Sequence, residues 1–209
     1  MDMKVNTLIT AHSGAENTID NTLESIRVMA ASGADIFEAD VRLVDGVLVM
    51  SHDAPKPGET ADSLEECFKI MQQHDGVCAQ MDLKMGDMVE KIDALAQKYG
   101  LSKRLIYAGG VSEKDAAYAR ANGLTVWYNS DSFPKDGDWV AGVNALGFDT
   151  LNLYFGDVSE KLLSENAHYL SVWTVDDEAM LRKLLAAGVK GITTKRVALA
   201  LQLRNEIQK

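Results

Sequence analysis

The sequence has few cysteines and prolines, no long apolar run, and fewer basic than acidic residues. Its 209 residues include 2 Cys, 3 Pro, 21 Lys plus Arg and 31 Asp plus Glu, for a formal net charge of -10. No apolar segment approaches the roughly 18 residues of a membrane span, and the N-terminus lacks the pattern of a secretion signal. The acidic surplus repels nucleic acid and anionic membranes. We therefore expect no nucleic-acid partner and no stable membrane insertion.

The two cysteines, Cys67 and Cys78, are too far apart for a Cys-x-x-Cys motif and lie in unrelated surroundings. Such isolated cysteines are typical of a reducing compartment, so we expect a cytoplasmic protein in which both are buried small apolar residues. The net negative charge also means that a site for an anionic substrate needs a local cation from Lys, Arg or a metal ion. The sequence gives no indication of the oligomeric state.

The sequence does contain a regular alternation of short apolar segments with amphipathic ones, which is typical of βα units around a parallel sheet. We expect strands at 6–12, 35–43, 47–53, 77–84, 104–110, 124–130, 149–155, 168–175 and 191–194. An Asp45-Gly46 turn predicts that 47–53 folds back antiparallel onto 35–43. The spacing of Ile19, Leu23 and Ile26 predicts a first helix from Thr18 to Ser32. Without the folded-back strand, eight strand and helix pairs remain.

Eight such units in 209 residues predict an α/β protein with a (β/α)8 TIM barrel fold, built as a single domain over 1–209 with minimal loops. An open doubly wound sheet is the rival architecture. It is disfavoured because no G-x-G-x-x-G follows the first strand and because eight units are many for that fold. Active sites of these barrels lie where the strands end, so polar residues at those positions are the functional candidates.

Polar residues at the ends of the first three barrel strands form one candidate site. They are His12, the pair Glu38 and Asp40, His52 after the hairpin, and the pair Asp82 and Lys84. Side chains alternate along a strand, so the members of each pair share a face. Three crowded carboxylates repel one another unless a cation offsets them, and hard oxygen ligands favour Mg²⁺ or Ca²⁺ over zinc.

Each of these residues also has a purely structural interpretation. A single carboxylate near a strand end often caps a helix or pairs with a lysine, and Asp82 with Lys84 fits that description. Glu38 and Asp40 are different, because they interrupt an apolar strand whose two faces are both expected to be buried. His74 and His168 lie at a helix end and at a strand start, and we interpret them as structural.

The order and spacing of several segments resemble the glycerophosphodiester phosphodiesterase family. The segments are His12-Ser13-Gly14-Ala15-Glu16-Asn17-Thr18, Gly33-Ala34-Asp35-x-x-Glu38-x-Asp40-Val41, Asp45-Gly46, His52-Asp53, Asp82-Leu83-Lys84, Val172-Trp173-Thr174-Val175 and Gly188-Val189-Lys190-Gly191-Ile192. This resemblance covers almost the whole chain. It implies a (β/α)8 barrel, a divalent metal ion, and two histidines that act as general acid and base on a phosphodiester.

The resemblance also implies a role for each matching residue. His12 and His52 match the catalytic histidines, and Lys84 and Trp173 match residues that contact the phosphate and the organic part of the substrate. The metal ligands that match are Glu38, Asp40 and Asp82, the last of these standing where the family usually has glutamate. Glu16 and Asn17 match supports of the first loop, or they cap the helix that follows.

Three departures from the family pattern bear on the substrate. Ser13 replaces an arginine that would bind phosphate through two hydrogen bonds. Lys195 replaces the aspartate of a Thr-Asp-x-Pro motif, and we expect it either to supply the missing positive charge to the substrate or to project into solvent. The segment between His52 and Cys78 is too short for the insertion that covers the site in many relatives.

Together these features predict a metal-dependent phosphodiesterase that cleaves a small glycerophosphodiester to an alcohol and a phosphomonoester. The enzyme alternative is a relative that acts on another phosphodiester, such as a lysophospholipid or a sugar phosphodiester, or one that releases a cyclic phosphate, as the sphingomyelinase D-type barrels do. A third hypothesis is a catalytically weak barrel that binds an anionic ligand. It is motivated by Ser13 but disfavoured by the two histidines, because simple binding requires no acid and base pair.

Overall fold

The computed structural model describes residues 6–133 and 137–208, and its strands form one sheet. The strand order is β6-β5-β4-β2-β1-β10-β9-β8-β7, with β3 paired to β2 outside this path. The strands are β1 (Leu8–Ala11), β2 (Ile36–Val44), β3 (Val47–Met50), β4 (Cys78–Leu83), β5 (Leu105–Gly109), β6 (Thr125–Val126), β7 (Tyr128–Asn129), β8 (Leu151–Tyr154), β9 (Leu170–Trp173) and β10 (Gly191–Thr194). Apart from the β2–β3 pair, every pairing is parallel.

The sheet closes into a barrel at Trp127, which separates β6 from β7. The backbone N–H of Trp127 donates to the carbonyl of Tyr107 on β5, while that of Tyr128 donates to the carbonyl of Thr150 beside β8. Consecutive residues thus pair with opposite neighbours, and the two edges of the sheet are joined. The predicted (β/α)8 barrel is confirmed. The expected strand 124–130 is corrected to two short strands, because the chain changes partner at Trp127.

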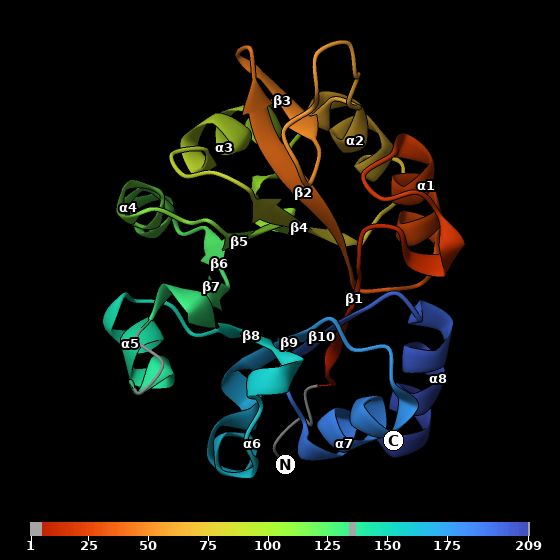
Figure 1. The fold of residues 1–209 in the computed structure, drawn as a ribbon, viewed down its shortest axis with the longest axis vertical. Helices are drawn as coiled ribbons and strands as arrows, with labels where there is room; N and C mark the ends of the chain where they lie inside the picture. The colour runs from red at the N-terminus through yellow and green to blue at the C-terminus, as the bar shows by residue number, and fades with distance from the viewer. Residues whose placement is uncertain (1–5, 134–136, 209) are drawn as a thin grey trace.

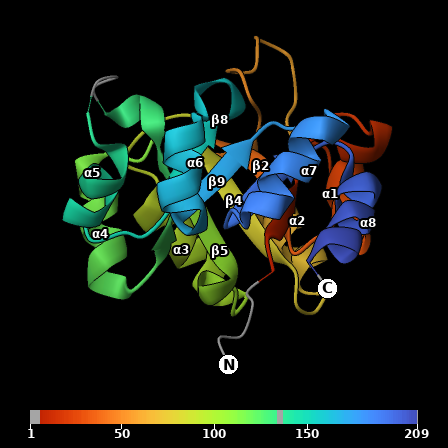
Figure 2. The same cartoon turned by 90° about the horizontal axis from the view of Figure 1, so that it is seen from below.

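Within residues 6–133 and 137–208, eight α-helices follow the barrel strands in the chain. They surround the strands (Figures 1 and 2). They are α1 (Leu23–Ala31), α2 (Leu64–Met71), α3 (Val89–Lys98), α4 (Glu113–Asn122), α5 (Trp139–Ala145), α6 (Glu160–Asn166), α7 (Glu178–Ala187) and α8 (Val197–Ile207). Short 3₁₀ turns lie at 15–17, 102–104, 130–132, 155–157 and 167–169. No helix of the described residues is long and apolar enough to cross a membrane.

Side-chain alternation divides the barrel into an outer apolar layer and a more varied interior. Outward-facing residues such as Ile9, Phe37 and Met81 are fully buried in the main hydrophobic core. Inside the barrel a second apolar cluster is formed by Ile36, Ile106, Ala108 and Trp127. Nearer the carboxyl ends of the strands, the inward-facing residues are polar. The apolar cluster therefore fills the barrel interior below the polar residues, which lie nearer the carboxyl ends of the strands.

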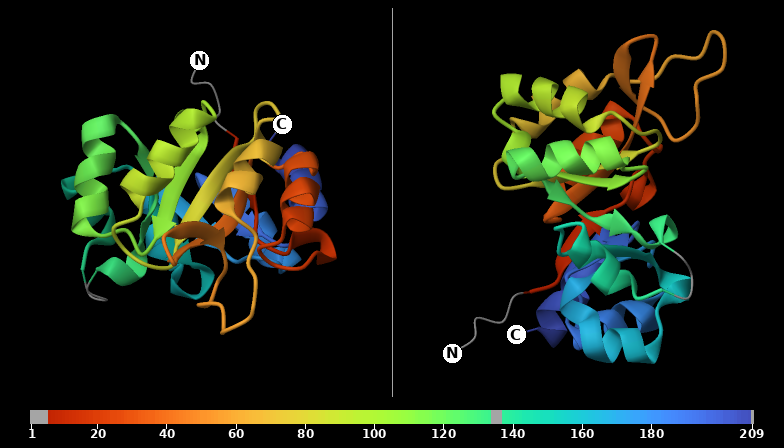
Figure 3. Two further views of the ribbon diagram at one scale, coloured as in Figure 1. Left: turned by 90° about the horizontal axis from the view of Figure 1, so that it is seen from above. Right: turned by 90° about the vertical axis from the view of Figure 1, so that its left-hand side faces the viewer.

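The Asp45-Gly46 hairpin forms as predicted and carries His52 back to the barrel. Both turn residues have positive φ, 48° and 82°, as the tight turn of a two-residue hairpin requires. β3 returns antiparallel to β2, and the backbone N–H of Ser51 donates to the carbonyl of Asp40 at 3.0 Å. The hairpin and the loop after it project from one face of the barrel (Figure 3).

The first helix is shorter than predicted. It begins at Leu23, with Thr22 as its N-cap. The segment from Thr18 to Asn21, expected to be helical, belongs instead to an irregular loop. Glu16, Asn17 and Asn21 have positive φ, which an α-helix does not permit. Ile19, expected on the buried helix face, is 74% exposed. This loop supplies polar groups to the site.

The two cysteines differ in burial. Cys67 is buried in the main core, as expected, and burial raises the pKa of its thiol to about 12. Cys78 is only partly buried, at the edge of the inner apolar cluster. The expectation of full burial is therefore correct for Cys67 and wrong for Cys78.

Candidate active site

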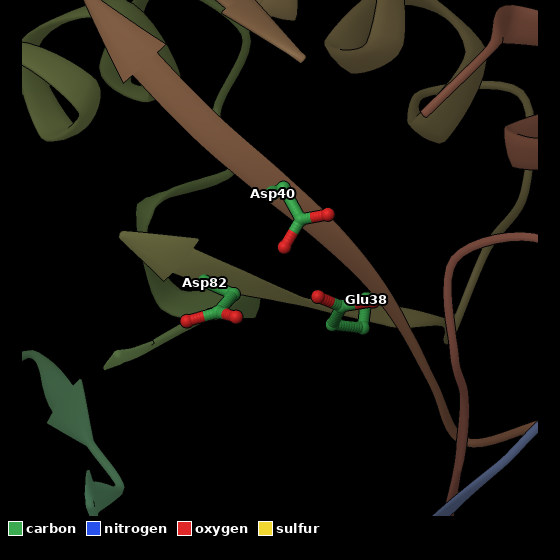
Figure 4. A group of neighbouring side chains, drawn as sticks. All are labelled: Glu38, Asp40 and Asp82. Carbon is green, nitrogen blue, oxygen red and sulfur yellow. The ribbon is translucent and has the colours of Figure 1, made fainter. Parts of the chain in front are cut away.

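The three predicted metal ligands come together inside the barrel, where Glu38 and Asp40 project from the body of β2 and Asp82 from the carboxyl-terminal part of β4 (Figure 4). The parallel register places Asp40 beside Asp82, with Glu38 one inward-facing position earlier on β2. One carboxylate oxygen from each residue lies within 4.8 Å of the others. Glu38 and Asp40 are buried and Asp82 is partly buried. These oxygens converge on one point inside the barrel mouth.

The loop after β1 holds two of these carboxylates in place. The backbone N–H of Ser13 donates to Glu38 Oε2 at 2.8 Å, and Asn21 Nδ2 donates to Asp40 Oδ2 at 2.7 Å. Asn21 Oδ1 also accepts from the backbone N–H of Asp40 at 3.0 Å. The Ser13 hydroxyl accepts from the backbone N–H of Asn21, so Ser13 braces the loop. Asn21 was not predicted, because nothing in the sequence indicates a pairing between this loop and β2.

Glu16 also braces the first loop. Its Oε1 accepts from the backbone N–H of Ala198 in the first turn of α8 at 3.1 Å. The carboxylate thus connects the start of the chain to its last helix. This contact agrees with a supporting role for Glu16 and not with a cap on the helix that follows, which begins at Leu23.

Lys84 provides the positive charge nearest to the carboxylates. Its ammonium lies 2.7 Å from Asp40 Oδ1 and 2.6 Å from Asp82 Oδ2. Burial acts to lower the pKa of Lys84, but the two aspartates outweigh this effect and the net shift is upward. Lys84 is therefore held as a cation at the site.

One lysine does not balance three carboxylates, as the direction of their pKa shifts indicates. Burial, followed by repulsion from Asp40 and Asp82, raises the pKa of Glu38 well above its usual value. Burial also raises the pKa of Asp82 in spite of Lys84. Burial acts to raise the pKa of Asp40 too, but hydrogen bonds from Lys84 and Asn21 lower it overall. An all-oxygen donor set with surplus negative charge fits a hard divalent cation.

The two predicted catalytic histidines each have Nδ1 directed at an oxygen. His12 Nδ1 lies 2.8 Å from the Ser13 carbonyl, and His52 Nδ1 lies 3.1 Å from Asp53 Oδ1. Because a carbonyl only accepts, Nδ1 of His12 carries a proton and Nε2 of the neutral ring is left as a proton acceptor. The Asp53 carboxylate favours the same tautomer in His52. The side chain of His52 is 68% exposed, at the open side of the site.

A cavity of about 850 Å³ unites these groups. Seven of the eight predicted site residues line it: His12, Glu38, Asp40, His52, Asp82, Lys84 and Trp173. The Trp173 ring centroid is 5.6 Å from that of Tyr154, which in turn is 4.6 Å from that of Phe155. Tyr154 and Phe155 are among the exposed large hydrophobic residues. An aromatic row therefore leads from the cavity to the protein surface.

Lys195 is the predicted residue that does not line the cavity. β10 does lie beside β1, as expected, but the Lys195 ammonium is 3.2 Å from Oδ1 of Asp20, a residue of the cavity wall. Gly14, with φ 75°, makes room for this pair, because a Cβ there would lie 1.7 Å from Asp20 Oδ1. A direct contact between Lys195 and the substrate stays a prediction.

Neutral polar residues that were not predicted also line the cavity, among them Gln80 on β4 beside Glu38, and Asn129, Asn152 and Thr193 on β7, β8 and β10. A sequence signal for two of them exists. Gln80 precedes Asp82 by two positions and so shares its face of the strand. Asn152 interrupts an apolar strand, as Glu38 does in β2.

Comparisons with known proteins identify one matching family and several structures of similar fold. Residues 12–84 match the model of the Glycerophosphoryl diester phosphodiesterase family. A Parabacteroides distasonis glycerophosphodiester phosphodiesterase superposes with a TM-score of 0.77 at 21% identity, covering 99% of this chain and 100% of that one. A Thermotoga maritima glycerophosphodiester phosphodiesterase gives 0.70 at 20% identity, covering 95% and 99%.

A third similar structure is an Oleispira antarctica phosphodiesterase in complex with the product sn-glycerol-3-phosphate. It has a TM-score of 0.77 and 17% identity, covering 96% of this chain and 97% of that one. No curated protein matches the chain by sequence. The matched segment contains every predicted catalytic and metal-binding residue. The predicted resemblance to the glycerophosphodiester phosphodiesterase family, whose enzyme class is that of phosphoric diester hydrolases, is thus confirmed.

Proposed function

We propose that the chain is a metal-dependent phosphodiesterase that cleaves a small glycerophosphodiester to an alcohol and a phosphomonoester. The observation that carries this proposal is the composition of one cavity, which is lined by three clustered carboxylates, a lysine and two histidines. Binding alone requires no acid and base pair, whereas phosphodiester cleavage requires proton transfer at both the attacking and the leaving oxygen. The family match over 12–84 and the product bound by the Oleispira antarctica enzyme support the same conclusion.

The carboxylates Glu38, Asp40 and Asp82 would hold the divalent ion, either Mg²⁺ or Ca²⁺. That ion would offset the negative charge of the phosphate and of its transition state. Lys84 is placed to contribute a second positive charge to a phosphate oxygen. Trp173 would cover the organic part of the substrate. Lys195, at the rim, would act on the phosphate from a greater distance.

His12 and His52 would perform the proton transfers. One removes a proton from the attacking oxygen while the other protonates the leaving alkoxide. The Ser13 carbonyl and Asp53 orient the two rings through Nδ1, which leaves both Nε2 atoms available for this task. The attacking oxygen belongs either to water, which gives the phosphomonoester directly, or to a neighbouring hydroxyl of the substrate. Attack by that hydroxyl releases the alcohol and leaves a cyclic phosphate, which water must then open to give the phosphomonoester.

Turnover of a substrate panel tests the proposal. Glycerophosphodiesters, lysophospholipids and sugar phosphodiesters would each be incubated with the protein and Mg²⁺ or Ca²⁺. Phosphorus NMR then identifies the product, because a cyclic phosphate and a phosphomonoester have different shifts. Metal-dependent release from a glycerophosphodiester supports the proposal. Release from another class only would change the substrate, and absence of release from all three would favour the anion-binding barrel.

We also propose a reducing, cytoplasmic environment for this activity. The two cysteines are free, and neither has a partner among the described residues. Isolated reduced cysteines are typical of that compartment. Fractionation of cells that produce the protein, with detection by antibody, tests this location.

A further inference from the structure

The exposed large hydrophobic side chains of the described residues gather at one end of the barrel. Each lies at the end of a barrel strand, in the loop that follows one, or at the tip of the β2–β3 hairpin. Their exposed fractions range from 37% for Phe155 to 74% for Ile19. This is the carboxyl end of the strands, from which the hairpin projects and where the main cavity opens (Figure 3). The five residues are Ile19 after β1, Val47 at the hairpin tip, Met85 after β4, and Tyr154 and Phe155 at the end of β8.

The rest of the described surface shows the opposite pattern. On the outer faces of the helices and in the loops at the amino ends of the strands, no large hydrophobic side chain is exposed. Single exposed hydrophobic residues are common in soluble proteins and need no explanation. Restriction of the whole set to one end of the barrel is different, because it indicates a surface that meets an apolar partner.

The position of these residues around the cavity mouth limits what the partner is. A second copy of the chain or another globular protein seated here would block the path of the substrate. A lipid surface would leave the path open, because its molecules diffuse and reach the cavity themselves. The aromatic row from Trp173 through Tyr154 to Phe155, with centroid separations of 5.6 and 4.6 Å, connects the cavity to this surface. Tyrosine and tryptophan are also favoured where an apolar layer meets water.

The charge around the mouth selects the kind of lipid. Exposed carboxylates lie at the same end of the barrel: Asp20 and Asp131 on the cavity wall and Asp53 beside His52. The net charge of the chain is -10. An anionic lipid surface would repel these groups, whereas zwitterionic phospholipids have no net charge and present ammonium groups that attract carboxylates.

We propose that the carboxyl end of the barrel docks reversibly on a zwitterionic phospholipid surface. The apolar side chains around the mouth enter the boundary of the acyl layer, and the carboxylates meet the ammonium groups. Binding of this kind scales with the apolar area that leaves water. The site then meets phosphodiesters carried on that surface, and this last consequence alone rests on the proposed function.

Sedimentation with vesicles measures the docking without any turnover. The full chain with Mg²⁺ would be mixed with dioleoylphosphatidylcholine vesicles or with dioleoylphosphatidylglycerol vesicles. We expect the protein to sediment with the phosphatidylcholine vesicles. Its partition coefficient for the phosphatidylglycerol vesicles should be at least about tenfold lower, because the net negative charge opposes that contact.

Two variants assign the binding to the carboxyl end. Ile19→Ser and Phe155→Ser should each lower the partition coefficient for phosphatidylcholine roughly three- to tenfold, the effect of withdrawing one apolar side chain from the lipid. Ile19 is the more exposed of the two, so Ile19→Ser keeps the test valid if Phe155→Ser does not fold. Turnover of a soluble glycerophosphodiester by Ile19→Ser should equal that of the parent.

A compensated variant separates this surface from general hydrophobicity. Ala121 is exposed in the last turn of α4, near the amino ends of the strands. Adding Ala121→Phe to the Ile19→Ser/Phe155→Ser double variant returns an exposed aromatic ring to the protein, but at the wrong end of the barrel. It should not restore vesicle binding, and full restoration would overturn the proposal.

The other failures are distinguishable. If the parent does not bind phosphatidylcholine vesicles, or if the double variant binds them as the parent does, the docking surface is wrong. Tighter binding to phosphatidylglycerol would also overturn it. A concentration-dependent dimer in sedimentation velocity that is lost in Ile19→Ser would assign this face to a second copy and overturn the lipid partner. The proposed function fails separately, through absence of turnover of soluble diesters, whether or not the vesicles are bound.

Discussion

The two halves of the cavity wall differ in the kind of polarity they present. The half formed by β1, β2 and β4 is charged, with the carboxylates, Lys84 and the histidines, and its members bond mainly to one another and to the first loop. The half formed by β7, β8 and β10 is neutral, with Asn129, Asn152 and Thr193. Within the described residues, several polar atoms of the neutral half have no protein partner.

This difference separates the tasks of the two halves. Clustered charges destabilise the metal-free site, as the raised pKa of Glu38 indicates, and such a cost is expected where chemistry needs charge. Neutral amides and hydroxyls repel one another little, and their value lies in the shape and hydrogen bonding that they offer a ligand. Changes in the charged half should therefore affect turnover most, and changes in the neutral half should affect selectivity.

Removal of the metal ion should have the largest effect. Chelation should abolish turnover, and added Mg²⁺ or Ca²⁺ should restore it, because three carboxylates need a cation before they can accept a phosphate. Asp40→Asn should weaken metal binding, measured by calorimetry. Asp149→Asn, which removes an exposed carboxylate at the opposite end of the barrel, is the control. Unchanged metal affinity in Asp40→Asn would remove Asp40 from the ligand set.

Loss of either histidine should have the next largest effect. His12→Ala and His52→Ala should each lower kcat by about 10²- to 10⁴-fold, the range for loss of a general acid or base, while KM changes much less. His168→Ala provides a matched control, because His168 is exposed and lies outside the cavity. Near-normal kcat in both site variants, measured on the best substrate of the panel, would refute their assignment.

The charged half could be predicted from the sequence for a physical reason. A charge within an apolar strand is costly unless it has a function, so Glu38 and Asp40 stand out in β2. Strand alternation and the Asp45-Gly46 turn then place Asp82, Lys84 and His52 beside them. The barrel followed from the repeated strand and helix pattern, since each unit is encoded locally.

The neutral half and the first loop were harder to predict. Asn and Thr are common at strand ends and in loops, so Asn129 and Thr193 give no distinct signal. The loop from Gly14 to Asn21 was assigned partly to a helix because Ile19 fits a helical period. Its real conformation depends on the contact between Asn21 and Asp40, which lie 19 residues apart in the chain, so this contact forms only in the folded barrel.

A smaller effect is expected on the stability of the metal-free protein. A carboxyl with a raised pKa in the folded state makes folding less favourable as pH rises above its unfolded value of 4.5, and Glu38 is such a group. With chelator present, the Tm of the parent should therefore decrease as pH rises above that value. Glu38→Gln keeps an acceptor for the Ser13 N–H and removes the charge. At pH 8 in chelator, the Tm of this variant should therefore be higher than the Tm of the parent.

The size of this gain follows from the length of the chain. Each kcal/mol of relieved repulsion should raise Tm by about 2–4 °C in a protein of this length. In saturating Mg²⁺ the Tm of the parent should instead exceed the Tm of Glu38→Gln, because the parent gains binding energy that the variant lacks. Glu165→Gln, at an exposed position of α6, should show neither change. A parent Tm independent of pH between 5 and 8 in chelator would contradict the repulsion.

Replacement of Lys195 should have the smallest effect and decides its role at the rim. Its ammonium pairs with Asp20, and such an exposed pair contributes only about 0–1 kcal/mol, so Lys195→Met should raise KM by roughly two- to fivefold.

The raised KM has two explanations: loss of a charge that attracts the phosphate, or exposure of the Asp20 carboxylate that repels it. Asp20→Asn separates them. If Lys195 acts on the phosphate, Lys195→Met should raise KM in the Asp20→Asn background by at least as much as in the parent. If Lys195 only neutralises Asp20, it should have no effect there. Lys190→Met, at the other end of the barrel, is the control for net charge. Unaltered KM in Lys195→Met itself would exclude the residue from substrate binding.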